Sequence, residues 1–431
     1  MSRFLLVTWE GGGVVPPELG LARRLIARGH TVHVLADASI EAEARAIGCS
    51  FDAFRQAPSR ASLRPEHEVF KSWEAGSPVA EFKGFLEHVM CGPAERYAAD
   101  VFELLDRHAF DAALVDMNLL GALIAVQARG LPHAALVPNI YLRPAPGIPP
   151  VGPGLLPATG PLDRARDAAL GWVSCLLWRG GLPPVNAACA KAGVAPVREI
   201  FELYDRADAV LVLTAAAFDF PATTLPPNVR YVGPLLDDPR WAGEELELPW
   251  VAEDRSPLVL VSLSSTFQGQ VQTVQRVVDG LSGLEARVLV TLGPALQAED
   301  IRSSAPNVVC VRGVPHGRVL PHARAMLTHS GHGTTIKALA HGVPQVCMPM
   351  GRDQADNAAR VVARGAGLKV AHTAAPKAIR AAVERVLREP SFGEAARGLG
   401  EAIRAETRVD PARIVEEVLL RGGRGADLAA L

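Results

Sequence analysis

The chain has 431 residues, of which 49% are hydrophobic and 21% are charged. This length is too great for one ordinary hydrophobic core, and the composition is that of a folded protein rather than a disordered one. The formal net charge is −2, whereas a protein that binds polyanions normally carries a basic excess. We therefore expect two domains, and we expect neither nucleic acid nor a charged membrane surface as a partner.

No segment indicates export or insertion into a membrane. The sequence has no run of 18 apolar residues, and the apolar stretch near its start is too short for the core of a signal peptide. Its six cysteines are scattered, without a C-x-x-C pair or the spacing of metal ligands. We therefore expect a cytoplasmic protein without integral membrane association and without a metal site.

The first half of the chain alternates apolar strands with helices. An apolar stretch, FLLVTW (4–9), is followed by the glycines 11–13, by the helical pattern ELGLARRLIARG and by a second strand, TVHVLAD (31–37). A strand, a glycine loop, a helix and a strand of this length form a βαβ crossover, which implies a parallel sheet. The same pattern returns in residues 110–139.

The second half repeats this architecture. It opens with a buried strand, PLVLVSLSS (257–265), and further apolar strands alternate with helices up to residue 350. Two halves with the same alternation predict an α/β protein of two doubly wound, Rossmann-like domains that face each other across a cleft. We expect a first domain in residues 1–240, a second in residues 250–405, and a C-terminal helix in residues 406–431 that packs back on the first domain.

Residues 144–161 contain so many Pro and Gly residues that neither a helix nor a central strand is expected there. Because strands resume at residues 207–214, we interpret this segment as a long loop over one face of the first domain. Long loops inside compact domains are usually functional.

The most informative segment is MLTHSGHGTTIKALA (326–340). A strand ends at His329, and a loop of small residues then opens a helix. Gly331 and Gly333 let backbone amides approach a ligand, and Thr334 adds a hydroxyl group. Unpaired first-turn N–H groups at the positive end of a helix dipole predict an anion site. The residues alone leave an alternative open, in which His329 merely ends a strand and Thr334 merely caps a helix.

Residues 307–370 resemble the carboxyl-terminal signature of the family 1 nucleotide-sugar glycosyltransferases of the GT-B fold, which include bacterial natural-product enzymes. The matching phrases are LPHARAMLTHSGHGT, ALAHGVP and PMGRDQADNAARV, while RYVGPL (230–235) resembles the hinge of the family. The resemblance implies inverting, metal-independent transfer of a sugar from a UDP- or dTDP-sugar to a hydroxyl group of a small, hydrophobic, natural-product-like or aromatic acceptor.

The resemblance also implies roles for individual residues. His329 would contact one phosphate of the leaving diphosphate, and the other phosphate would be held by Gly331, Gly333 and Thr334. The hydroxyl groups of the transferred sugar would be bound by Asp353 and Gln354, although Asp353 is alternatively a helix cap. A second polar contact would come from Ser264, Ser265 and Thr266, which are alternatively an ordinary turn, and the backbone of Val314 would read the edge of the base.

No metal or cofactor is expected besides the nucleotide sugar. A helix N-terminus and a histidine can stabilise the charge that grows on a departing diphosphate without a cation. No D-x-D pair suited to magnesium occurs near this loop.

The sequence departs from the family at three positions. Val14 stands where many members have the histidine that deprotonates the acceptor. Lys337 stands where the family usually has a glutamate that holds the ribose; the lysine either donates to ribose or phosphate or faces solvent. Gly313 stands where many relatives stack an aromatic side chain on the base.

Carboxylates are the candidates for the missing base. Asp116 ends a strand on the predicted cleft side and would accept the proton if burial raised its pKa; the alternative is a helix cap. Glu10, beside the glycine turn, is the next candidate. His88, His133 and Asp37 are weaker ones.

The acceptor site is thinly specified. Beside Gly13 and Val14 of the glycine turn, we expect an apolar acceptor pocket that includes Phe70, Trp73 and Phe85, although such residues are more often plain core. Three other functions stay open: C-glycosylation of a phenolic acceptor, a non-catalytic nucleotide-sugar-binding partner that lacks the base, and a nucleotide-sugar epimerase. The identities of sugar, base and acceptor and the oligomeric state are not determined by the sequence.

Overall fold

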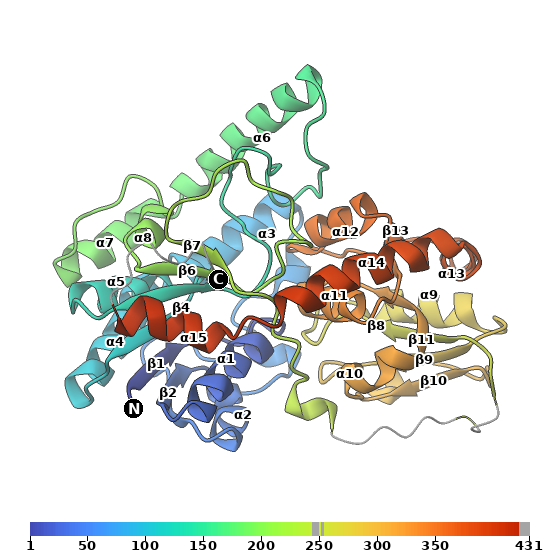
Figure 1. The fold of residues 1–431 in the computed structure, drawn as a ribbon, viewed down its shortest axis with the longest axis horizontal. Helices are drawn as coiled ribbons and strands as arrows, with labels where there is room; N and C mark the ends of the chain where they lie inside the picture. Colours follow the sequence, from blue (N-terminus) through green and yellow to red (C-terminus); the bar gives the residue numbers. More distant parts are fainter. Residues whose placement is uncertain (244–249, 251–253, 422–431) are drawn as a thin grey trace.

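The structure is a computed structural model that describes residues 1–243, 250 and 254–421. The chain forms two α/β halves, each built around a parallel sheet, and the two halves lie side by side (Figure 1). The predicted fold class, α/β with two Rossmann-like halves, is confirmed.

The sheet of the first half has seven parallel strands in the order β3-β2-β1-β4-β5-β6-β7. Its central strands are buried on both faces, which explains why they read as continuous apolar runs rather than alternating ones. The strands are β1 (Arg3–Val7), β2 (Thr31–Ala36), β3 (Ser50–Ala53), β4 (Ala112–Asp116), β5 (His133–Val137), β6 (Ala209–Val212) and β7 (Val229–Tyr231).

The sheet of the second half has six parallel strands in the order β10-β9-β8-β11-β12-β13. The order reverses at β8, so the carboxyl ends of β8 and β11 form the switch point at which open α/β sheets bind ligands. The strands are β8 (Leu258–Ser262), β9 (Arg287–Thr291), β10 (Val308–Val311), β11 (Ala323–Thr328), β12 (Gln345–Cys347) and β13 (Gly367–Lys369).

Helices cover both faces of each sheet (Figure 1). In the first half they are α1 (Val15–Ala27), α2 (Glu41–Ala46), α3 (Pro78–Phe85), α4 (Ala94–Arg107), α5 (Leu120–Ala128), α6 (Pro161–Arg179), α7 (Leu182–Ala192) and α8 (Glu202–Asp205). In the second half they are α9 (Val271–Leu281), α10 (His316–Val319), α11 (His332–Ala340), α12 (Gln354–Ala363), α13 (Pro376–Arg388) and α14 (Pro390–Glu406).

The end of the chain returns to the first half. Helix α14 packs on α11, and α15 (Pro411–Val415) then lies against α1 (Figure 1). Ala412, Val415 and Leu419 join the core that Phe4 and Leu6 form under the first sheet. Residues 422–431 of the expected C-terminal helix, and part of the expected boundary near residue 250, lie outside the described residues, so the domain limits stay a prediction.

The proline- and glycine-rich segment 144–161 is a loop, apart from one isolated bridge between Ala145 and Ile148. The backbone N–H groups of Gly152 and Gly154 donate to the carboxylate of Asp356 on α12, at 2.7 and 3.1 Å. The loop of the first half is therefore tied to a helix of the second half.

Helix α6 follows this loop and projects from the rest of the molecule (Figure 1). The sequence gives no clear signal for this helix, because none of its residues is buried and it therefore has no buried apolar face. Among the described residues, no helix combines the length and the apolar character that crossing a membrane requires.

A buried ion pair joins the two halves. Arg360 of α12 donates to Asp219 of the first half at 2.7 and 2.8 Å, and both side chains are at most 2% exposed. The guanidinium group also lies 4.3 Å from the ring centroid of Phe220. Backbone N–H groups and Tyr231 complete the hydrogen bonds of the Asp219 carboxylate.

We predict that Asp219→Ala lowers the free energy of unfolding by about 3–5 kcal/mol, because it leaves the Arg360 charge buried without its partner. Urea denaturation of the wild type and the variant measures this loss. Glu41→Ala is the control: it removes an ion pair to Arg45 in which both side chains are about half exposed, and such pairs contribute about 0–1 kcal/mol. Equal midpoints for the wild type and Asp219→Ala would contradict the assigned role.

Candidate active site

A single cleft between the two halves brings the predicted nucleotide-sugar residues together. Its walls are the loops at the carboxyl ends of the strands, and it encloses about 1340 Å³, part of it open to solvent. All ten predicted donor-binding residues line it, together with two of the predicted acceptor-binding residues: Ser264, Ser265, Thr266, Val314, His329, Gly331, Gly333, Thr334, Asp353 and Gln354 from the second half, and Gly13 and Val14 from the first.

His329 is held as a neutral hydrogen-bond donor. The backbone N–H of Ser264 donates to its Nδ1 at 3.1 Å, so the ring proton resides on Nε2. Burial lowers the pKa of His329 to about 4. The imidazole is therefore uncharged at neutral pH and presents one N–H group at the cleft.

Gly331 leaves room for this imidazole ring at the start of α11. A Cβ atom at residue 331 would lie 2.5 Å from Nε2 of His329, a distance that no ordinary contact allows. Gly331 caps the helix, and its carbonyl accepts from the N–H of Thr335. Among the hydrogen bonds of the described residues, none is donated by the backbone N–H groups of His332, Gly333 or Thr334. Three free amides and a neutral donor thus face the cleft.

Backbone strain concentrates around the same site. Among the described residues, three that are not glycine have a left-handed φ: Ser264 (37°), Ser330 (69°) and Arg352 (55°). They occupy the loops that follow β8, β11 and β12. Left-handed backbone in such residues is unfavourable and collects at functional sites.

Asp353 and Gln354 begin α12 on the neighbouring wall. The Asp353 side chain does not cap the helix; it accepts from Nδ2 of Asn357 at 2.8 Å, and burial raises its pKa. Gln354 accepts from the N–H of Met350 at 2.7 Å and donates to Gln268 at 2.8 Å. Both side chains are thus oriented by fixed partners.

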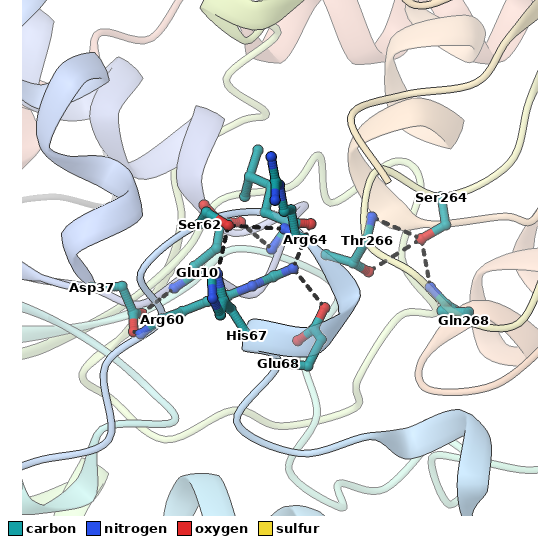
Figure 2. Close-up of polar contacts among 12 residues, drawn as sticks. Glu10, Asp37, Arg60, Ser62, Arg64, His67, Glu68, Ser264, Thr266 and Gln268 are labelled. Carbon is teal, nitrogen blue, oxygen red and sulfur yellow. Dashed lines mark hydrogen bonds and ion pairs between the residues drawn. The ribbon is translucent and has the colours of Figure 1, made fainter. Parts of the chain in front are cut away.

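Gln268 was not recognised from the sequence. It donates to Oγ of Ser264 at 2.7 Å, and Oγ of Ser264 also contacts Oγ1 of Thr266 at 3.2 Å (Figure 2). The predicted polar contact of residues 264–266 is therefore a hydrogen-bonded group linked through Gln268 to Gln354. No local pattern identifies a glutamine of this kind.

The glycine turn of the first half touches this group. A Cβ atom on Gly12 would lie 2.7 Å from the Thr266 side chain and 3.1 Å from that of Ser265. Glu10 precedes the turn, beside Asp37 and Arg60 (Figure 2). Oε1 of Glu10 accepts from the N–H of Gly12 at 3.0 Å, and burial raises the pKa of Glu10 to about 8. Glu10 does not itself line the cleft.

Asp116, at the end of β4, has an unexpected partner. Both Asp116 and Glu18 of α1 are fully buried, and Glu18 lies against Asp116 and the hydroxyl group of Thr8. Burial and the Asp116 charge raise the pKa of Glu18 well above its ordinary value.

Burial also raises the pKa of Asp116, to about 6, against the opposing effect of an N–H bond from Asn118 and of Glu18. Oδ2 of Asp116 has no donor in good geometry among the described residues. Asp116 does not line the cleft, so its role as the base stays a prediction.

The weaker candidates have structural surroundings. Nδ1 of His133 lies 2.9 Å from the carbonyl oxygen of Leu131. Asp37 accepts from the backbone N–H groups of Glu10 and Arg60, at 2.6 and 2.5 Å. His88 stacks on Phe70, with ring centroids 5.6 Å apart. None of the three lines the cleft.

The three aromatic residues predicted for the acceptor also lie outside the lining of this cleft. Phe70 stacks on His88, and Phe85 lies 6.0 Å from Trp9 between ring centroids. Trp73 contacts Phe267 of the second half edge to face at 4.9 Å. Their role in acceptor binding stays a prediction.

Lys337 does not face solvent; it is 7% exposed. Its Nζ donates to the carbonyl oxygen of Asp237 at 3.0 Å and to the carboxylate of Asp238. Burial lowers the pKa of Lys337, and the Asp238 charge opposes this effect. The segment between the halves therefore supplies a carboxylate beside the position where the family usually has a glutamate.

Comparison with known proteins agrees with this geometry. Residues 275–419 match the family model "Erythromycin biosynthesis protein CIII-like, C-terminal domain". The chain is 27% identical over 427 residues to 4'-demethylrebeccamycin synthase of Lentzea aerocolonigenes, covering 96% of this chain and 99% of that protein. It is also 27% identical to O-mycaminosyltylonolide 6-deoxyallosyltransferase of Streptomyces fradiae, covering 96% and 97%.

The chain is a glycosyltransferase of the GT-B fold. Among solved structures, the glycosyltransferase of kitacinnamycin matches with a TM-score of 0.74 at 22% identity, covering 96% of this chain and 98% of that one. Glycosyltransferase VinC, solved in complex with dTDP, matches with a TM-score of 0.67 at 21% identity, covering 97% and 100%. The chain is therefore similar, in sequence and in fold, to glycosyltransferases of antibiotic pathways.

We predict that Gly331→Ala destabilises the protein by about 1–3 kcal/mol, because the added methyl group collides with the imidazole of His329. Gly333→Ala is the matched control, since a Cβ atom there meets nothing within 4 Å, and alanine in a helix is favoured over glycine by about 1 kcal/mol. Thermal unfolding of the unliganded proteins measures both effects. A Gly331→Ala midpoint at or above that of Gly333→Ala would contradict this packing.

Proposed function

We propose that this glycosyltransferase transfers a sugar from a UDP- or dTDP-sugar to a hydroxyl group of a small hydrophobic acceptor, with inversion at the anomeric carbon and without a metal ion. The observation that carries the proposal is the convergence of three free amides of α11 and the Nε2–H of His329 on one cleft. The complex of VinC with dTDP supports the nature of the donor.

The strand order supports a linear arrangement of the donor. The cleft residues follow β12 (Asp353, Gln354), β11 (His329, Gly331), β8 (Ser264), β9 (Thr291) and β10 (Val314), and these strands are consecutive neighbours in the sheet. Sugar, diphosphate and nucleoside then lie in that order along the sheet edge. Three strand spacings of about 4.8 Å, roughly 14 Å in all, separate β11 from β10.

In the proposed step, the acceptor oxygen attacks the anomeric carbon as the bond from that carbon to the phosphate oxygen breaks. The bonding electrons leave with the nucleoside diphosphate. Negative charge grows on the phosphate oxygens, which the free amides of α11 and the neutral His329 donor stabilise by hydrogen bonds. Because these donors are fixed before the reaction, the step requires no cation, and attack opposite the leaving group inverts the anomeric configuration.

The acceptor's proton goes to a carboxylate in place of the absent histidine. We assign this role to Asp116, because it ends β4 at the carboxyl edge of the sheet and burial raises its pKa to about 6, close to the range that suits a general base. A hydrogen bond with Glu18 lowers the pKa of Asp116 against the effect of burial and so stabilises the ionised form. Asp116 is fully buried and does not line the cleft, so the proton must pass the residues that line it. Glu10, beside the glycine turn, is the second candidate.

A pH profile separates the two carboxylates. If Asp116 is the base, kcat/KM falls as the pH drops below about 6, because protonation removes the acceptor for the proton. If Glu10 is the base, the fall begins below about pH 8. We expect the first profile and expect Asp116→Asn to reduce kcat by at least about 100-fold, with nucleotide affinity unchanged.

Glu18 variants test the pair. Glu18→Leu removes the group that stabilises ionised Asp116, so we expect the acidic limb to move to higher pH. Glu18→Gln keeps a hydrogen-bond donor of the same size and should leave the limb close to its wild-type position. Full kcat in Asp116→Asn, or an acidic limb of the pH profile that stays at the same pH in Glu18→Leu, would exclude the pair from the mechanism.

Product analysis tests the reaction itself. The purified chain is incubated with UDP- and dTDP-sugars and with phenolic and macrolide acceptors, each mixture with and without EDTA, and the products are analysed by mass spectrometry and NMR. We expect an O-linked product of inverted anomeric configuration. A carbon-linked product would identify a C-glycosyltransferase, an epimerised donor an epimerase, and binding without turnover a non-catalytic protein. Turnover that stops with EDTA would contradict metal independence.

A further inference from the structure

The segment between the halves places an indole at the nucleoside end of the cleft. Trp241, in the short turn Arg240–Ala242, lines the cleft together with Val314 and Thr291. Among the described residues that line the cleft, it is the one Phe, Trp or Tyr side chain. In proteins that bind single-stranded nucleic acids, the bases stack on such side chains, and every kind of base does so.

The wall opposite Trp241 is shaped to admit its ring. A Cβ atom on Gly313, which follows β10, would lie 3.1 and 3.3 Å from two atoms of the six-membered ring of the indole. Any larger residue at 313 would therefore force the ring to move. The indole of Trp241, which comes from the other side of the cleft, therefore fills the space that a side chain on residue 313 would occupy.

Trp241 is held by both halves of the molecule. The carboxylate of Glu43 on α2 lies close enough to the backbone N–H groups of Arg240 and Trp241 for them to lower its pKa against the effect of burial. Three residues earlier, the carboxylate of Asp238 accepts from Lys337 and, at 2.9 Å, from the N–H of Gly317 in the second half. The ring is therefore presented by a segment with fixed partners on each side.

The position of Trp241 along the sheet edge matches the distance between the diphosphate and the base of the donor. The diphosphate cradle follows β11, whereas Gly313 and Val314 follow β10, roughly 14 Å away by three strand spacings of about 4.8 Å. A ribose lies between a diphosphate and its base, and the end of β9 with Thr291 lies between these two walls.

We propose that Trp241 is the stacking platform for the nucleobase of the donor, supplied by the segment between the halves in place of a side chain on the β10 loop. The assignment rests on the proposed function, because it requires a nucleoside diphosphate in this cleft. Its ligand is a pyrimidine ring, and stacking alone accepts uracil and thymine alike.

Calorimetric binding of UDP, dTDP and inorganic pyrophosphate tests the proposal. Trp241→Ala should weaken UDP and dTDP binding by about 5- to 150-fold, the range of one lost base stack, and should leave pyrophosphate binding unchanged. Trp172→Ala is the matched control, because Trp172 lies on α6 and is 66% exposed; its nucleotide affinity should equal that of the wild type.

Two further variants exclude a loss caused by misfolding. Trp241→Phe retains an aromatic face and should bind UDP within about threefold of the wild type. In the double variant Trp241→Ala/Gly313→Trp, an indole enters the same space from the opposite wall, and nucleotide affinity should recover in part. Gly313→Trp alone should weaken binding, because two rings then compete for one space.

The outcomes separate the inference from the function it rests on. Unchanged UDP affinity in Trp241→Ala, or equal losses for UDP and pyrophosphate, would overturn the platform while leaving the glycosyltransferase proposal intact. A wild-type protein that binds neither UDP, dTDP nor pyrophosphate would instead defeat the proposed function.

Discussion

The surrounding structure holds two kinds of hydrogen-bond donor at one place in the cleft. They are three unpaired amides at the start of α11 and the imidazole of His329, which donates only from Nε2. The amides are free because a helix cannot pair its first N–H groups internally. The imidazole keeps its tautomer because Ser264 donates to Nδ1, and it keeps its place because residue 331 has no side chain. Left-handed backbone at Ser264, Ser330 and Arg352 shows the cost of bringing the three loops together.

The two halves are joined by polar contacts that are themselves buried. Asp219 and Arg360 form an ion pair with almost no exposure, and Asp356 holds the loop around Gly152. Such contacts are directional, because a buried charge without its partner is far more costly than a lost apolar contact. The arrangement of the halves is thereby tied to specific side chains, in addition to an apolar cluster in which Ile140, Ala215 and Phe218 of the first half pack with residues of α11, α12 and α14.

Most of the fold could be predicted because the signals are local. Strands such as FLLVTW and PLVLVSLSS appear as apolar runs, and the glycine loop before α11 identifies the anion site within a few residues. Partners from remote segments could not be predicted. Glu18 occupies a polar position in the first turn of a helix, and nothing nearby shows that Asp116 lies beside it. The burial of Lys337 could not be predicted either, because the segment that covers it, which contains Asp238, is remote in the sequence. Helix α6 was missed because it lacks the buried face that helical periodicity reveals.

The joint between the halves bears on any attempt to recombine this enzyme with its relatives. A hybrid cut after residue 243 retains Trp241 from the first parent but takes residue 313 from the second. Where the incoming loop carries a bulky group at that place, two large side chains compete for one space. Where it carries glycine, the indole of the first parent is accommodated. With the proposed role of Trp241, the compatibility of exchanged halves depends on a pair of residues on opposite sides of the cut, and donor affinity is not inherited from the second half alone.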